Sequence, residues 1–101
     1  MSYRIKLLPL AYKDLQRAKK WYNEKRNNLG EEFKKAVIAE IDYIQSHPEH
    51  YQRKYKTLRQ SLVIGFPYAI FYLIEESTQR IIIFGVLHTS RNPEIARRRI
   101  K

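Results

Sequence analysis

The N-terminal part of the chain changes from a period of two to a helical period. Residues 3–7 alternate apolar and basic side chains, which predicts a strand with one buried face. From Ala11 the apolar side chains instead recur at the spacing of one helix face, with cations on the remaining arc. The apolar positions of this predicted amphipathic helix are Ala11, Leu15, Ala18, Tyr22 and Leu29.

A second helix is predicted after Asn27 and Asn28, which interrupt the first. Asn28 is followed three residues later by Glu31, a spacing typical of a helix N-cap pair. The pattern ends at Ser46, before Pro48, so the first half predicts a helical hairpin. Its second apolar face consists of Phe33, Val37, Ile41 and Ile44.

The second half is rich in β-branched and aromatic residues. Strands are predicted over residues 57–64, 68–75 and 80–87, and the short turns between them favour an antiparallel meander. The continuous apolar run 81–84 indicates a central strand that is covered on both faces. Residues 94–100 form a short helix or a tail in this prediction.

These elements predict a β-α-α-β-β-β chain of the α+β class. A helical hairpin would pack on a small, mainly antiparallel four-stranded sheet. The 101 residues suit a single domain, 1–101. The longest apolar stretch, residues 69–74, is far too short for a membrane span, and we expect a cytoplasmic protein with no membrane partner.

The net charge of the chain indicates which kinds of partner it binds. The chain contains twenty Lys and Arg residues and ten Asp and Glu residues, which gives a net charge of +10. Such a charge favours an anionic partner: a nucleic acid, an acidic protein surface or an acidic disordered segment. The chain has no cysteine, which excludes disulfides, a thiolate nucleophile and cysteine zinc sites. The three glycines are scattered and form no phosphate-binding loop.

Two basic clusters are candidate binding sites. Lys54 and Lys56 precede Arg59, which lies on an apolar strand. The guanidinium of Arg59 could bind a phosphate or a carboxylate through two hydrogen bonds. The alternative for the two lysines is a solvated loop. The tail carries Arg97, Arg98, Arg99 and Lys101, either as solvated charge or as a salt-sensitive contact with phosphates.

His88 is the candidate for acid–base chemistry, because it ends the most apolar strand close to Arg91. The alternative is a hydrogen-bonded packing residue. His47 and His50 flank Pro48, which breaks the helix that would bring them to one face, and a metal site there is disfavoured.

Trp21 and Tyr22 could offer a surface for base stacking. On an amphipathic helix, however, adjacent aromatic residues more often pack in the core or against another helix. We therefore predict packing roles for both residues.

Residues 66–72, followed by Val86-Leu87-His88 and Arg91-Asn92-Pro93, resemble the RelE/ParE superfamily of type II toxin–antitoxin toxins, often labelled plasmid stabilisation proteins. The likeness extends over nearly the whole chain. It implies a small bacterial toxin without a cofactor, held inactive in a hetero-oligomer by a cognate antitoxin with an acidic, partly disordered segment. Further matching positions are Asp14-Leu15, Trp21-Tyr22, residues 29–33, Pro48, Tyr51 and Arg59.

The superfamily's branches differ in their targets. RelE-like members are ribosome-dependent endoribonucleases, and ParE-like members inhibit DNA gyrase without enzymatic chemistry. The nucleases typically carry an arginine after the tyrosine that corresponds to Tyr68, where this chain has Ala69, and many carry a C-terminal tyrosine, whereas the last tyrosine here is Tyr72. The resemblance therefore favours the ParE-like branch.

Two alternatives stay open at this point. As an endoribonuclease acting on mRNA in the ribosome, the chain would use His88, Arg59 and Arg91 as its catalytic residues. The other alternative is a non-toxic basic module that binds nucleic acid. In any of these functions, the residues expected to contact the target or a nucleic acid are Lys54, Lys56, Arg59, Arg91, Arg97, Arg98 and Arg99. Whether the chain binds a target or cleaves RNA, we expect Arg59, His88 and Arg91 to lie close together at one end of the sheet.

Overall fold

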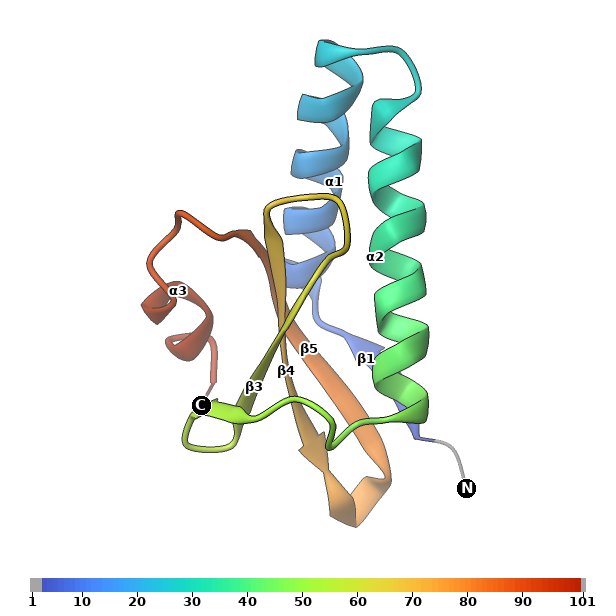
Figure 1. Ribbon diagram of the computed structural model, residues 1–101. Coiled ribbons are helices and arrows are strands. Elements are labelled where there is room, and N and C mark those ends of the chain that lie inside the picture. Colours follow the sequence, from blue (N-terminus) through green and yellow to red (C-terminus); the bar gives the residue numbers. More distant parts are fainter. Residues whose placement is uncertain (1–2, 101) are drawn as a thin grey trace.

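The computed structural model describes residues 3–100, with two long helices against one face of a sheet and a short helix against the other (Figure 1). Lys101 of the predicted basic tail lies outside the described residues. The elements are β1 (Arg4–Leu7), α1 (Pro9–Lys25), α2 (Leu29–Ser46), β2 (Arg53–Tyr55), β3 (Leu58–Leu62), β4 (Tyr68–Glu75), the 3₁₀ turn η1 (Glu76–Thr78), β5 (Arg80–His88) and α3 (Glu94–Arg97).

The sheet has the order β1-β5-β4-β3-β2. β1 runs parallel to β5, and every other pair of neighbours is antiparallel. The α+β class and the helical hairpin are confirmed. The predicted count of four strands is wrong, because β2 adds a fifth strand of three residues, too short and too polar to show a hydrophobic period. The strand predicted over residues 57–64 is also shorter, Leu58–Leu62.

β5 lies at the centre of the core, as the continuous apolar run predicted. Ile81 and Ile83 belong to the cluster under the two long helices, whereas Ile82 and Phe84 pack on the opposite face with Ala96 of α3. Past Phe84 a bulge in the pairing with β4 shifts the alternation, so that Val86 faces the helices.

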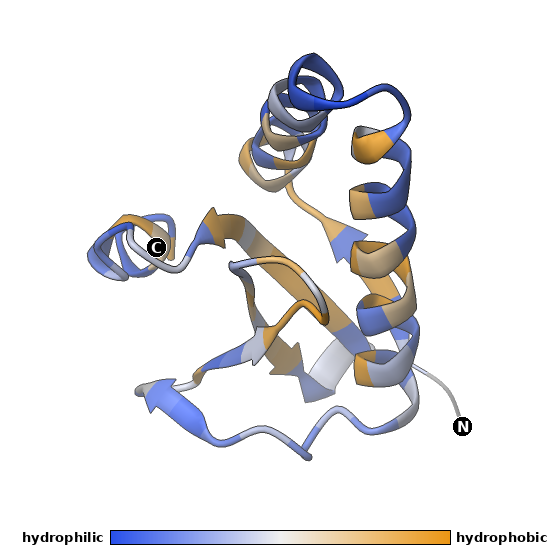
Figure 2. Cartoon of the chain, turned by 45° about the horizontal axis from the view of Figure 1, so that its top comes forward, coloured by the Kyte–Doolittle hydropathy of each residue, from blue (hydrophilic) through white to orange (hydrophobic). Residues whose placement is uncertain are grey.

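The long helices turn their apolar sides toward the sheet and their polar sides outward (Figure 2). α1 begins at Pro9, two residues before the predicted start, since proline is suited to the first helical position. Tyr22 is buried, as predicted, and its ring centroid lies 5.2 Å from that of Phe33. Phe33 in turn lies 4.9 Å from Tyr68 and 5.2 Å from Phe66, which completes an aromatic core cluster.

The start of α2 is capped by the other helix of the hairpin. Asn28 has a left-handed backbone (φ 68°) and makes no side-chain cap, because a capping side chain requires an extended backbone at that position. The predicted Asn28–Glu31 cap is therefore wrong. Instead, the amide Oδ1 of Asn23 on α1 accepts a hydrogen bond of 2.7 Å from the backbone N–H of Gly30.

Gly30 lies where the two helices of the hairpin are in close contact, which gives a test. A Cβ at this position would lie 2.3 Å from the backbone carbonyl oxygen of Lys19. Helix propensity alone would make Gly30→Ala stabilising by about 1 kcal/mol, but the clash forces the helices apart and we expect a net loss of about 1–3 kcal/mol. Urea unfolding followed by circular dichroism measures this change.

The control for this substitution is Ala39→Gly at an exposed position of the same helix, which reports the propensity effect alone. A Gly30→Ala protein that is more stable than the parent would contradict the close packing of α1 on α2.

Candidate functional site

A cleft of about 510 Å³ opens between α1 and the adjoining ends of β4 and β5. α1 contributes Arg17 and Trp21, which are one helical turn apart and both exposed. The strand ends contribute Tyr68 and His88, which pair directly in the sheet. We call this site the α1 cleft; its lining residues are Asp14, Arg17, Ala18, Trp21, Tyr22, Pro67, Tyr68, Val86, Leu87, His88, Ser90 and Arg91.

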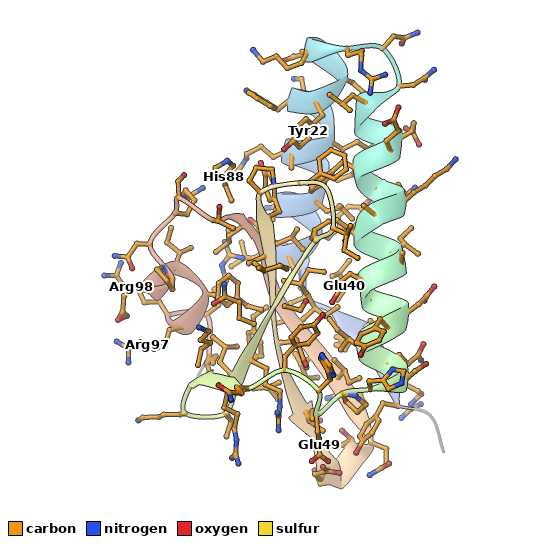
Figure 3. All side chains as sticks on the ribbon, in the orientation of Figure 1. Tyr22, Glu40, Glu49, His88, Arg97 and Arg98 are labelled. Carbon is orange, nitrogen blue, oxygen red and sulfur yellow. The ribbon has the colours of Figure 1, made fainter. Side chains whose placement is uncertain are left out.

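His88 lines the α1 cleft and is oriented by two contacts. The backbone N–H of Ser90 donates a hydrogen bond of 3.0 Å to its Nδ1, and its ring stands edge-on to Tyr68 at 5.3 Å. Figure 3 shows His88 near the turn that joins β3 to β4, where Thr89 N–H donates to the carbonyl of Pro67. Because Nδ1 is an acceptor, this hydrogen-bond pattern assigns the proton of the neutral ring to Nε2.

Apart from Asp14, the charged side chains in the lining of the cleft are cations, and Tyr68 adds a neutral hydroxyl. Burial raises the pKa of the Tyr68 hydroxyl, and the nearby Arg91 guanidinium opposes that shift in part, so Tyr68 is neutral at physiological pH. The guanidinium groups of Arg17 and Arg91 form no ion pair with any residue between 3 and 100. An anionic ligand is therefore the one that this lining suits.

Asp14 at the base of the cleft is neutralised from the C-terminal segment. Arg99 donates to its two carboxylate oxygens at 2.6 and 3.3 Å, and also to the carbonyl of Phe84 at 2.9 Å. Asp14 Oδ2 accepts a further bond of 3.1 Å from Val86 N–H. This contact, which we call the Asp14–Arg99 latch, covers the edge of β5 beyond the point where β1 ends. The side chain of Arg99 is 15% exposed, which contradicts its prediction as a free phosphate-binding cation.

Arg59 does not reach the α1 cleft. It pairs with Tyr72 on β4, four residues from Tyr68, which pairs with His88, and this spacing corresponds to about 13 Å along the strand. The predicted patch of Arg59 with His88 is therefore wrong. The expected patch was inconsistent with the predicted antiparallel meander: β3 and β5 are both antiparallel to β4, so they run in the same direction, and the last residues of β3, not its first, lie toward His88.

The Arg59 guanidinium binds the loop that follows α2. It donates a bond of 2.6 Å to the carbonyl of Tyr51, whose hydroxyl donates to Glu40 at 2.6 Å. Tyr72 donates to the carbonyl of Pro48 at 2.9 Å, and burial raises its pKa to about 12. These contacts fix residues 48–51 on the sheet, so Arg59 has a structural partner.

The remaining predicted cations lie elsewhere on the surface. Lys54 and Lys56 are exposed at the edge formed by β2, the far side of the sheet from β1. Arg97 at the end of α3 and Arg98 just after it are exposed and point away from the sheet (Figure 3), and Arg97 forms an ion pair with Glu94. Of the predicted site residues, the α1 cleft therefore brings together only His88 and Arg91.

His47 and His50 both contact Tyr43. The ring of His47 stacks on that of Tyr43 at 4.5 Å, and His50 Nδ1 lies 3.2 Å from the Tyr43 hydroxyl. Within residues 3–100 no three potential metal-ligating side chains come together. In the same part of the chain, each helix is too short or too polar to cross a bilayer.

Arg17 and Trp21 are two of the cleft residues that sequence analysis did not assign to a site. The packing role predicted for Trp21 is wrong, since the residue is 51% exposed. A signal was available: Lys13, Arg17, Trp21 and Lys25 repeat every four residues, which places an aromatic ring within a row of cations on the polar side of the helix.

Comparison with known proteins agrees with the fold. Residues 5–93 match the family described as the ParE toxin of the type II toxin–antitoxin system parDE. A solved structure of the chromosomal ParDE toxin–antitoxin system from P. aeruginosa superposes with a TM-score of 0.75 at 12% identity, over 85% of this chain and 95% of the other, and this likeness concerns the fold alone. No curated protein matches the sequence. Because the family match spans most of its length, the chain belongs to the ParE toxin family of type II toxin–antitoxin systems.

Proposed function

We propose that this toxin acts on DNA gyrase and not by cleaving mRNA. The observation that carries the proposal is the separation of Arg59 from His88, together with the hydrogen bond that occupies His88 Nδ1. Metal-free RNA cleavage needs a base for the 2′-hydroxyl, cations at the crowded phosphate and an acid for the leaving oxygen within one site.

His88 is poorly placed to act as that base. With Nδ1 accepting the Ser90 N–H and the proton on Nε2, the neutral ring offers a donor to the cleft and no free lone pair. Ala69 stands where the RNA-cleaving branch typically has an arginine, and its side chain is buried against the α3 face of the sheet. These two features support a mechanism of target binding.

The exposed cations are the proposed contacts with the target. Arg91 lies at the α1 cleft, Lys54 and Lys56 at the β2 edge, and Arg97 and Arg98 on α3, so that they cover different sides of the protein. Arg59 and Arg99 are withdrawn from this set because each has a structural partner.

Membership of the ParE family implies an antitoxin partner, and we propose that its toxin-binding segment is acidic and partly disordered. The net charge of +10 on 101 residues supports this, since an acidic segment that orders on binding could screen cations on several sides at once. The neutralised toxin would then be a hetero-oligomer in the cytoplasm.

The proposed target is tested with purified protein in two assays side by side, gyrase supercoiling and mRNA cleavage on translating ribosomes. We expect inhibition of supercoiling and no codon-positioned cleavage. His88→Ala should leave supercoiling inhibition within about twofold of the parent, because no chemical step depends on its ring. Codon-positioned cleavage that disappears in His88→Ala, with supercoiling unaffected, would overturn the proposal in favour of an endoribonuclease.

The toxin–antitoxin assignment has its own test in growing cells. Expression of the chain alone should stop growth, and co-expression with the product of an adjacent gene should restore it. A chain that accumulates without slowing growth would instead support the non-toxic nucleic-acid-binding module.

A further inference from the structure

We propose that the α1 cleft binds single-stranded nucleic acid, with a base against Trp21 and phosphates at Arg17 and Arg91. This inference goes beyond the gyrase proposal and does not depend on it. It places the contact on α1, away from the basic clusters at β2 and α3 that the sequence suggested.

The charge of the cleft supports an anionic ligand. Arg17 and Arg91 line the cavity from α1 and from the segment after β5, and His88 at the end of β5 lines it with its Nδ1 already accepting the Ser90 N–H. Asp14 is the one acidic side chain in the lining, and Arg99 holds both of its oxygens. A phosphate therefore meets cations and donors without an opposing free carboxylate.

The shape and the aromatic surface favour a base beside that phosphate. A cavity of about 510 Å³ is within the range of sites for small organic ligands, about 300–1,000 Å³. Half of Trp21 is exposed, although tryptophan usually buries most of its surface. Lys25 Nζ lies over the Trp21 ring, 4.8 Å from its centroid, a cation–π contact that brings positive charge to one face and leaves a base the other face to stack on.

The cleft continues as a row of cations along α1. Lys13, Arg17, Trp21 and Lys25 are each exposed and separated by four residues, so that they lie about 6 Å apart along the helix axis. Proteins that bind single strands without sequence preference combine such a basic track with an aromatic stacking surface. An acidic peptide could satisfy the arginines, but a planar base explains the exposed indole as well.

Trp21 is the single tryptophan of the chain, so its fluorescence reports this site directly. We expect short oligothymidylate and oligouridylate to quench it, with binding that weakens steeply between about 50 and 200 mM salt. Comparison of the two oligonucleotides distinguishes a DNA ligand from an RNA ligand. Poly-glutamate of similar length tests the acidic peptide.

Variants locate the contact by anisotropy of a labelled oligonucleotide. Trp21→Ala should weaken binding about fivefold to a hundredfold, since stacking is lost. Arg17→Ala should weaken binding and make the negative slope of log affinity against log salt concentration less steep by about 1. Arg53→Ala is the matched control, because it also removes one exposed arginine, but at the β2 edge of the sheet and away from the α1 cleft.

Each outcome decides the proposal. Quenching by oligonucleotides, with a larger loss for Arg17→Ala than for Arg53→Ala, supports it. Equal losses for the two arginines without quenching would mean diffuse charge attraction and would overturn it, as would quenching by poly-glutamate alone. The gyrase assay is read separately, so failure here leaves the proposed target untouched.

Discussion

Replacing Arg99 by alanine is expected to lower the free energy of unfolding by about 3–5 kcal/mol, a large loss for a residue near the end of the described chain. The substitution leaves the Asp14 carboxylate, whose side chain is 6% exposed, without a counter-charge, and leaves the Phe84 carbonyl without its donor. Removing one partner of a buried pair costs more than the pair contributes, because the remaining charge stays desolvated.

Urea unfolding of a double-mutant cycle measures the Asp14–Arg99 latch. Asp14→Ala with Arg99→Ala should cost less than the sum of the two single changes, since no unpaired charge then remains. Arg98→Ala is the control, because that neighbouring arginine is exposed and should change stability by less than about 0.5 kcal/mol. Equal effects of the Arg98 and Arg99 substitutions would show that the latch does not form in solution.

The second large effect is expected for Phe33→Ala, with a loss of about 3–5 kcal/mol. Phe33 is fully buried, and its ring contacts those of Tyr22, Phe66 and Tyr68 with centroids about 5 Å apart. The substitution opens a cavity where α2 meets the β3–β4 turn, and the edge-to-face contacts are lost with it.

Thermal and urea unfolding measure this loss, and Ile38→Ala on the same helix is the control, because Ile38 is 44% exposed. Tyr68 also lines the α1 cleft, so Phe33→Ala should disturb oligonucleotide quenching of Trp21 as well. A loss of stability no larger than that of Ile38→Ala would contradict the close packing of Phe33 in the aromatic core cluster.

Most of the fold follows from local periodicity, which explains why the hairpin and four of the five strands could be predicted. β2 could not, because three residues held by register with a neighbouring strand carry no pattern of their own. The predicted helix cap was wrong for a related reason: the side chain that accepts the hydrogen bond from Gly30 N–H is that of Asn23, which lies on the other helix.

The candidate site was harder to predict, since charge reports only that a cation is present and not what it contacts. His88 and Arg91 were found because they follow a recognisable strand. Arg59 and Arg99 resemble the exposed arginines in sequence, yet tertiary contacts give them backbone and carboxylate partners. Trp21 was assigned to the core because its neighbour Tyr22 belongs there, and a step of one residue on a helix turns the side chain by about 100°.

The parallel pairing of β1 with β5 sets the order in which the chain can fold during synthesis. Arg4 is aligned with Arg80, and Asp14 pairs with Arg99, so neither the first strand nor the contact of α1 with β5 can form until nearly the whole chain has been made. The helical hairpin has local contacts and can form early, whereas closing the sheet is a long-range step of the kind that slows folding. We therefore expect the α1 cleft, which needs α1 and the end of β5 together, to be completed among the last parts of the molecule.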